Sequence, residues 1–344
     1  MSLPIAEIAA APRAELAGIE LPARFTGLAE ECAALRERAG VFDASLRRWV
    51  RMRGEDRVAF LQGMVSNDVK VLAAGDTAYV ALLTQQGRVV SDLRVYAAED
   101  HFILDLPAQA AAAAQAALER YIVADDVELE ADDGLLIGLE GPAIPALLAA
   151  VAAGPTPARF GHASICGCDV RFAPASHAGE GGVVIAVAAA DVAAVWHALR
   201  DAGAGAVGLN ALDVLRVEAG IPWMGIDMDD DVLVMEADLE NAISFKKGCY
   251  LGQEVVERVS ARGHVNRKRT GLAFDGAPVL ARTPLLAADK EVGWVTSSVA
   301  SPRLARTIGM GYVRREHLVP GTVLDVSGGG RATVAALPFV KGSA

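Results

Sequence analysis

Runs of apolar residues, separated by turn residues, divide most of the chain into short strands and helices. Between residues 48 and 130 the pattern predicts a strand, a helix, three strands, a helix and a closing strand. A similar order recurs between residues 135 and 208, with one strand predicted over residues 164–172. This order is typical of the split βαβ plan of ferredoxin-like units. We therefore predict two related α+β units in tandem, after a loose N-terminal segment.

The pattern changes after Thr270. Glycine, proline and aspartate separate the short β runs that follow, at residues 271–274, 291–297, 307–313, 322–326 and 333–337. Short strands with such turns are typical of a small antiparallel barrel or sandwich. The sequence therefore predicts an all-β unit at its C-terminal end.

Length and composition are those of a globular protein. The 344 residues suggest about two to three domains, and 53% hydrophobic with 22% charged residues exclude disordered and fibrous classes. Since no apolar stretch approaches the ~18 residues of a membrane span, we expect no membrane partner. The first twenty residues include Glu7, Arg13 and Glu15 and lack a signal-peptide pattern, so we predict a cytoplasmic protein.

The net charge of −11 arises from 32 basic and 43 acidic residues. This charge repels phosphate backbones, so direct binding of nucleic acid is not expected. The four cysteines lack the paired spacing of a zinc site and are too few for a disulfide scaffold. We interpret Cys166 and Cys168 as packing residues and the aspartates between residues 227 and 231 as a solvated loop. The histidines, including His177, stay unassigned.

Residues 244–258 suggest chemistry most strongly. Lys246 and Lys247 precede Cys249, and a helix is predicted from about Gly252. A cysteine just before a helix lies at the positive end of the helix dipole, and adjacent ammonium groups stabilise a thiolate. Such a thiol can be a nucleophile, a redox sensor or a metal ligand. The alternative is a small packing residue in a tight turn.

The run from Lys247 to Glu254, followed by Arg258 and Arg262, resembles the signature of the YgfZ family, folate-binding relatives of the glycine-cleavage T-protein. Weaker similarities to the T-protein superfamily occur at residues 38–43, 60–63, 66–69, 216–222 and 309–313. The resemblance implies two discontinuous ferredoxin-like domains around a central folate channel, plus a C-terminal β-barrel. The expected boundaries are 25–50 with 134–225 and 243–263, then 51–133 with 226–242, then 264–344.

The resemblance also implies residues that hold folate. Glu218 would accept two hydrogen bonds from the pterin edge, as carboxylates do from guanidinium groups. Its alternative is a surface charge paired with Arg216. Arg258 and Arg262 belong to a basic cluster with residues 264 and 267–269. This cluster would hold the glutamate tail of folate, an acidic client or RNA, or would be a solvated face.

Asp92 is the remaining candidate. By this resemblance, working T-proteins carry two adjacent aspartates where this chain has Ser91 and Asp92, and one of them orients the folate nitrogen and the aminomethyl group. A hydroxyl cannot replace a carboxylate beside a developing positive charge. Ser91 therefore weighs against aminomethyl transfer, unless Asp92 is the residue that acts. The alternative for Asp92 is an exposed strand position.

The main prediction is a folate-binding, YgfZ-like protein that supports iron–sulfur cluster assembly or maintenance. Tetrahydrofolate, or another folate, would occupy the channel, with Lys247, Cys249 and Tyr250 at the site. Cys249 would be a transient cluster ligand or a redox thiolate. The implied partners are iron–sulfur client enzymes or assembly proteins, which would connect the chain indirectly to tRNA modification.

A second hypothesis is a tetrahydrofolate-dependent aminomethyltransferase, or a demethylase-linked folate enzyme. Its candidate catalytic residues are Asp92, Lys247 and Cys249. A third is a folate sensor or scaffold without chemistry. Asp92 favours the second hypothesis, whereas Ser91 and the cysteine motif favour the first. The sequence leaves open whether the chain is an enzyme.

Overall fold

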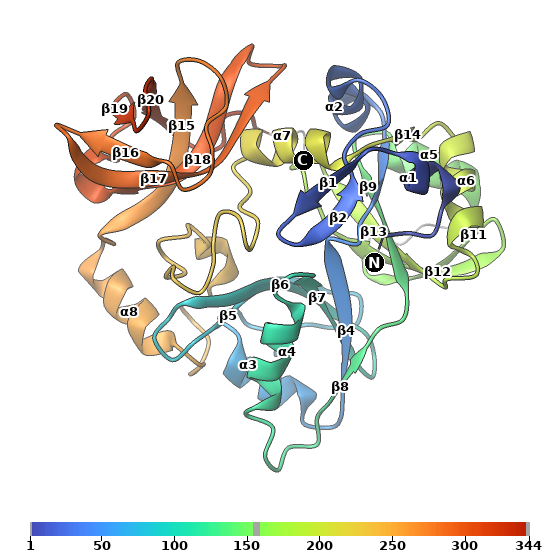
Figure 1. Cartoon of the computed structure of the whole chain (residues 1–344). Helices are drawn as coiled ribbons and strands as arrows, with labels where there is room; N and C mark the ends of the chain where they lie inside the picture. Colours follow the sequence, from blue (N-terminus) through green and yellow to red (C-terminus); the bar gives the residue numbers. More distant parts are fainter. Residues whose placement is uncertain (1, 154–158, 342–344) are drawn as a thin grey trace.

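The computed structural model of the chain describes residues 2–153 and 159–341, and every structural statement below concerns these residues. They form a five-stranded sheet, a seven-stranded sheet, a two-stranded hairpin and one closed barrel (Figure 1). Helix α7 (Leu209–Glu218) and the chain that follows it lie between the barrel and the two sheets. The mixed α/β sheets and the six-stranded barrel confirm the predicted fold class.

The antiparallel sheet at the bottom of Figure 1 has the order β5-β6-β7-β4-β8. Its strands are β4 (Arg47–Arg53), β5 (Thr77–Leu83), β6 (Val89–Ala97), β7 (Phe102–Pro107) and β8 (Glu128–Ala131). Helices α3 (Arg57–Met64) and α4 (Ala111–Glu119) pack on it, and Leu61, Leu93 and Leu118 share the core between them. The elements predicted between residues 48 and 130 are confirmed, because each has a clear apolar period.

The second sheet has the order β10-β11-β12-β13-β9-β3-β14, and β14 pairs with β3 in parallel. Its strands are β3 (Gly40–Asp43), β9 (Leu135–Glu140), β10 (Ala152–Ala153), β11 (Gly161–Ile165), β12 (Cys168–Pro174), β13 (Gly182–Val187) and β14 (Gly205–Ala206). Its helices are α2 (Leu28–Glu37), α5 (Ile144–Val151) and α6 (Val192–Asp201). The single strand predicted over residues 164–172 is wrong. Cys166 and Gly167 have positive φ and turn the chain into a hairpin.

The prediction of a loose N-terminal segment is also wrong. Helix α1 (Ala6–Ala10) and the hairpin of β1 (Arg13–Leu16) and β2 (Ile19–Pro22) precede α2. Ile5 and Ile8 are buried in the same core as Trp196, whose indole N–H donates to Glu7 over 2.9 Å. The partner lies almost two hundred residues away in sequence, so no local pattern could indicate the contact.

The C-terminal unit is a closed antiparallel barrel of order β15-β18-β17-β16-β19-β20, closed by pairing of β20 with β15. Its strands are β15 (Arg267–Phe274), β16 (Pro284–Ala287), β17 (Lys290–Ser301), β18 (Arg306–Arg314), β19 (Val323–Val326) and β20 (Arg331–Ala335). Helix α8 (Gln253–Arg262) precedes it, and short 3₁₀ turns cover Glu240–Ala242 and Arg315–His317. The predicted barrel is confirmed, although β16 is too short for its period to appear in the sequence.

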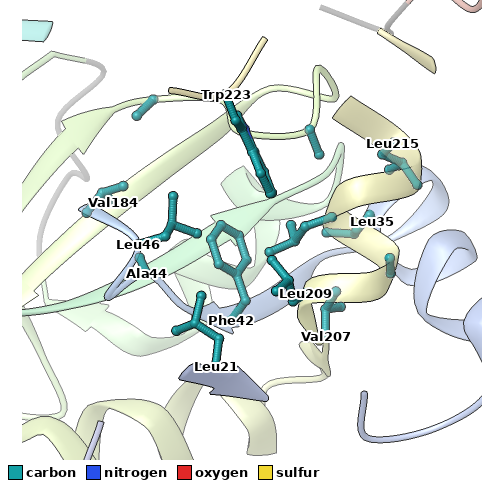
Figure 2. Close-up of a cluster of buried hydrophobic side chains, with 14 of the residues drawn as sticks. Leu21, Leu35, Phe42, Ala44, Leu46, Val184, Val207, Leu209, Leu215 and Trp223 are labelled. Atoms are coloured by element: carbon teal, nitrogen blue, oxygen red, sulfur yellow. The ribbon is translucent and has the colours of Figure 1, made fainter. Parts of the chain in front are cut away.

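Phe42 lies at the centre of the core that joins the second sheet to α7. Figure 2 shows its ring between Leu46 and Leu209, directed toward Trp223. Gly138 on the neighbouring strand β9 has no side chain to displace this ring, since a Cβ there would lie 2.2 Å from ring atoms of Phe42. Packing around Phe42 therefore fixes strand β3 next to the segment that follows α7.

The predicted domain boundaries stay predictions. The chain passes from the second sheet to the first between Asp43 and Arg47, and it returns to the second sheet between Ala131 and Leu135. Lys247, from the stretch 243–263 that we grouped with the second sheet, is hydrogen-bonded to residues around the end of α3 instead. None of the helices among the described residues has the length and apolar content needed to cross a lipid bilayer.

Candidate active site

A cavity of about 680 Å³ lies where the first sheet, the turn between β12 and β13, the segment after α7 and the barrel meet. This volume is within the range of about 300–1,000 Å³ typical of small-molecule sites. The polar residues on its wall are Arg47, Tyr79, Asp92, Arg94, Gln109, Ser176, His177, Asp238, Glu240, Asn241 and Arg269. Apolar surface comes from residues such as Leu46, Trp223 and Leu239. The cavity therefore combines an apolar wall with a few converging polar groups.

Strand alternation places Asp92 on the cavity side of β6. Successive side chains of a strand point to opposite faces. Asp92 and Arg94 line the cavity, whereas Leu93 and Val95 lie in the core under α3 and α4. Ser91 has the same parity as Leu93 and is fully buried, and its hydroxyl donates to the carbonyl oxygen of Asp92. Of the pair at 91 and 92, Asp92 is the one on the cavity wall.

The carboxylate of Asp92 has one paired and one unpaired oxygen. The Tyr79 hydroxyl donates to its Oδ2 over 3.1 Å, while Oδ1 has no hydrogen-bond partner in the described part of the chain. Asp92 is 7% exposed, so the exposed strand position considered above is wrong. Burial, with Asp92 nearby, raises the pKa of Tyr79 well above its usual range, so the phenol keeps its proton and donates.

Two arginines border Asp92 on the first sheet. The Nε of Arg47 donates to Asp105 Oδ1 over 2.9 Å, and Arg94 lies 3.9 Å from the other oxygen of Asp105. Arg94 also lies over the ring of Tyr79, with its guanidinium carbon 5.7 Å from the centroid. Asp105 is fully buried and holds both cations in place beside the cavity. The charges of these two arginines are balanced by Asp105 and Asp92, and the guanidinium groups offer N–H donors to a ligand with acceptor groups.

His177 and Gln109 also place unpaired polar atoms at the cavity. His177 is 4% exposed, and neither of its ring nitrogens has a hydrogen-bond partner among residues 2–153 and 159–341. Burial, together with the positive charges of Arg94 and Arg47, lowers the pKa of His177 well below its usual range, so its ring is neutral. Gln109 donates to the Met224 carbonyl oxygen, but its Oε1 is unpaired in the same residues.

Arg269 at the start of the barrel forms the opposite wall. Its Nε donates to the carbonyl oxygen of Ala237 and its Nη1 to that of Gly220, each over 2.9 Å. These bonds connect β15 to the segment after α7. We predicted Arg269 only as one member of a basic cluster, and its neighbours Arg267 and Lys268 lie within 3.2 Å of Glu236 and 2.7 Å of Asp238, respectively. Much of the predicted cluster is therefore neutralised within the molecule.

Lys247 lies away from this cavity. Its ammonium donates to the carbonyl oxygens of Gln62, Val65 and Asn67 over 2.6, 2.6 and 3.0 Å. The last carbonyls of a helix lack partners within the helix, so Lys247 caps the end of α3. Burial lowers the pKa of Lys247 to about 8. Its charge faces these carbonyls, which gives Lys247 a structural role here.

Cys249 is exposed in the loop before α8 and is a free thiol. Within the described residues, neither Cys249 nor Tyr250 lies on the cavity wall, and Tyr250 is buried with Val256 in a separate core. Arg258 pairs on the surface with Glu254 at 2.5 Å. Arg262 is exposed at the end of α8. Of the signature residues, Cys249, Arg258 and Arg262 are thus on the surface, and among the described residues only Asp92 of the predicted site residues lines the cavity.

Glu218 is 2% exposed and has protein partners on both oxygens. Arg36 of α2 donates to Oε2, and Ser301 of β17 donates to Oε1. Within the part of the chain that the structure describes, Glu218 does not line the cavity. The alternative, a surface charge paired with Arg216, is wrong, because Glu218 is buried and Arg216 pairs with other carboxylates. Glu218 therefore connects α7 to α2 and to the barrel.

Arg216 pairs with a different carboxylate, at the start of the acidic run. Its guanidinium contacts Asp213 at 2.7 Å and Asp227, and Asp227 also accepts from the hydroxyls of Thr296 and Ser297. The solvated-loop interpretation is wrong for Asp227, which is buried. Its partners come from α7 and the barrel, and nothing in the local sequence indicates them.

The sequence analysis missed His177, Arg47, Arg94, Gln109 and Tyr79 as members of one site. They come from three strands (β4, β5 and β6), the segment between β7 and α4, and the turn between β12 and β13, spread over about 130 residues. The only local signal was the alternation along β6, which puts Asp92 and Arg94 on one face. Pairing of β5 with β6 then brings Tyr79 opposite Arg94.

Two family descriptions match the chain. Residues 6–247 match the GCVT N-terminal domain, and residues 267–341 match the glycine cleavage T-protein C-terminal barrel domain. Among solved structures, the aminomethyltransferase T of the glycine cleavage system from Bartonella henselae is similar, with a TM-score of 0.89 and 28% identity. The match covers 97% of this chain and 95% of that one.

Curated relatives are similar over nearly their whole length. A protein of Rubrobacter xylanophilus named aminomethyltransferase is 31% identical, over 95% of this chain and 90% of its own. One of Pelodictyon phaeoclathratiforme with the same name is 34% identical, over 98% of this chain and 97% of its own. These names favour the aminomethyltransferase alternative over our main prediction. The YgfZ, iron–sulfur and tRNA predictions gain no support from them.

Proposed function

Because the chain belongs to the glycine cleavage T-protein family, we propose that it binds tetrahydrofolate in the cavity and transfers an aminomethyl-type one-carbon unit to it. The observation that carries the proposal is the buried carboxylate of Asp92, whose Oδ1 has no partner in the described residues. A buried polar atom without a partner is costly, and at a cavity wall a ligand can satisfy it.

The donor set on the wall fits a reduced folate. Asp92 Oδ1 and Gln109 Oε1 accept hydrogen bonds, and the guanidinium groups of Arg47, Arg94 and Arg269 donate them. A pterin ring carries both donors and acceptors, and the glutamate part carries carboxylates that suit arginine. Tetrahydrofolate would supply one ring nitrogen and the neighbouring exocyclic amine nitrogen that take up the one-carbon unit.

Asp92 would stabilise the positive charge that develops on the amine during transfer. A preorganised charge in a site that excludes water is worth more than the same charge in water. Tyr79 holds one oxygen of the carboxylate and leaves the other for the substrate. Ser91 is directed into the core, so its presence in place of an aspartate removes no carboxylate from the cavity wall.

Two measurements test this proposal. Calorimetry with tetrahydrofolate measures binding, and formation of methylenetetrahydrofolate from an aminomethyl lipoyl carrier measures transfer. We expect both to be positive. Absence of binding overturns the whole proposal, whereas binding without turnover overturns aminomethyl transfer and keeps folate binding.

The exposed thiol of Cys249 favours a second function, a YgfZ-like accessory protein for iron–sulfur enzymes. The thiol is free and accessible on the surface segment before α8, outside the proposed transfer site. Cys249→Ser, introduced into cells whose own copy of the gene is deleted, would then lower the activity of iron–sulfur enzymes while folate affinity is retained. Cys166→Ser, which removes another exposed thiol, is the matched control. Equal enzyme activity in both variants rules this function out.

A further inference from the structure

The turn at residues 176–179, between β12 and β13, is held by a buried carboxylate. Glu140 at the end of β9 is fully buried and accepts hydrogen bonds from the backbone N–H groups of His177 and Ala178, the latter over 2.9 Å. The Ser176 hydroxyl donates to the same carboxylate over 2.9 Å and accepts from the N–H of Gly179. The backbone N–H groups of residues 177–179 thus all have partners.

The first sheet holds the same turn from the other side. Nη2 of Arg94 donates to the Ser176 carbonyl oxygen over 2.9 Å. Glu140 belongs to the second sheet and Arg94 to the first, so the turn is fixed across the junction of the two sheets. Desolvation of a carboxylate is costly, and burial raises the pKa of Glu140. This costly buried carboxylate therefore serves to hold the backbone of the turn in place.

The ring of His177 is also held in place, but its two nitrogens lack hydrogen-bond partners among the described residues. The His177 imidazole packs edge-on against Phe42, with centroids 5.6 Å apart and an interplanar angle of 77°. It lines the cavity, and neither nitrogen has a hydrogen-bond partner in the parts of the chain described. A side chain that only filled space would be apolar here, because an unpaired buried imidazole destabilises the empty protein.

We infer that His177 contacts the ligand directly and determines specificity for its ring, with one ring nitrogen hydrogen-bonded to the amide-like edge of the pteridine. This inference rests on the proposed function. A neutral imidazole offers one donor and one acceptor. Depending on which nitrogen carries the proton, the nitrogen that faces the ligand can pair with an acceptor or with a donor of the pteridine edge, whereas a carboxylate tail only accepts and pairs better with the arginines of the same wall.

The test uses His177→Phe, which removes both nitrogens and keeps an aromatic ring against Phe42. Calorimetry measures affinity for tetrahydrofolate and for 6-methyltetrahydropterin, which has the same ring and no aminobenzoylglutamate tail. We expect affinity for both to fall at least tenfold. The melting temperature of the ligand-free variant should equal or exceed that of the wild type, because an unpaired polar group has been removed.

Two further variants complete the design. His177→Asn restores one donor and one acceptor and should recover part of the affinity, and His197→Phe, at an exposed position of α6, should change nothing. Unchanged affinity in His177→Phe overturns the inference, as does a loss of affinity accompanied by a lower melting temperature in the ligand-free variant. A loss confined to tetrahydrofolate overturns the assignment to the ring. Wild type that binds neither compound overturns the proposed function and this inference together.

Discussion

The Tyr79 hydroxyl holds Oδ2 of Asp92 over 3.1 Å, and Oδ1 of the same carboxylate has no hydrogen-bond partner in the described chain. Residues 79 and 92 lie on adjacent antiparallel strands, where Tyr79 is opposite Arg94 in the register. Because burial keeps the phenol protonated, this contact orients the carboxylate without neutralising it. One oxygen is fixed and the other is available to a ligand.

Replacing Asp92 tests the role of that oxygen. Asp92→Asn keeps the shape and the acceptor for Tyr79 but removes the charge. We expect kcat for aminomethyl transfer to fall by about 10²–10³, the usual cost of losing one preorganised electrostatic group. Tetrahydrofolate affinity should also fall, because an NH₂ group replaces the free acceptor oxygen, but by less than kcat, since the charge matters most as positive charge develops. Single-turnover kinetics with calorimetry separates the two effects.

Ser91→Ala serves as the control for Asp92→Asn. Ser91 is directed away from the cavity, so this variant should keep kcat within about twofold while losing one buried hydrogen bond of about 1 kcal/mol. A loss of transfer as large as that of Asp92→Asn would show that the Ser91 side of β6 takes part in the reaction.

Glu218 is expected to affect stability and not folate affinity. Glu218→Gln leaves Arg36 without its closest carboxylate, in a contact that is largely buried. We expect the free energy of unfolding to fall by about 1–3 kcal/mol. The Kd for tetrahydrofolate should stay within about twofold. Urea denaturation and calorimetry measure the two quantities, and a tenfold rise in Kd at unchanged stability would return Glu218 to the binding site.

His177 should make stability depend on pH in mildly acidic solution. Its folded-state pKa is lowered by burial and by the charges of Arg94 and Arg47, whereas the unfolded chain takes up a proton near pH 6.5. Below that pH the unfolded state binds more protons, so stability falls as pH falls, by at most about 1.4 kcal/mol per pH unit.

The comparison of wild type with His177→Phe isolates this effect. Glu140, which contacts the backbone of residue 177 from β9, titrates in both proteins and cancels in the difference. Urea denaturation between pH 5 and 7.5 should show a steeper loss of stability in the wild type. Parallel curves would mean that the imidazole can be protonated in the folded protein.

A substitution that disturbs the packing around Phe42 is expected to change the stability of the protein. Gly138→Ala would place a Cβ 2.2 Å from the ring, so strand or ring must move. We expect a loss of about 1–3 kcal/mol in the free energy of unfolding. Gly63→Ala, in helix α3 with open space around the new methyl group, should instead add about 0.4–1 kcal/mol. Chemical denaturation measures both, and a neutral Gly138→Ala would mean that the core next to His177 is loosely packed.

The local pattern of apolar residues predicted the secondary structure correctly where an element was long enough to show a clear apolar period. Strand β6 and helix α6 have clear apolar periods, and both were predicted within a few residues. The hairpin at Cys166 was missed because alternation continues through it, and only the backbone reversal at Gly167 separates β11 from β12. The N-terminal helix was missed because Ile8 is buried by residues that are distant in sequence.

The sequence by itself determined the order of the elements between residues 48 and 130, the barrel at the end of the chain and the identity of Asp92 as a candidate, since each depends on neighbours within one element or on a short motif. Tertiary structure alone decided that Asp92, Tyr79 and His177 share a cavity, and that Lys247 and Glu218 are bonded within the protein. Strand register and the packing of sheets against each other set which side chains meet and which polar atoms lose water. Both depend on contacts between distant residues, which no local pattern records.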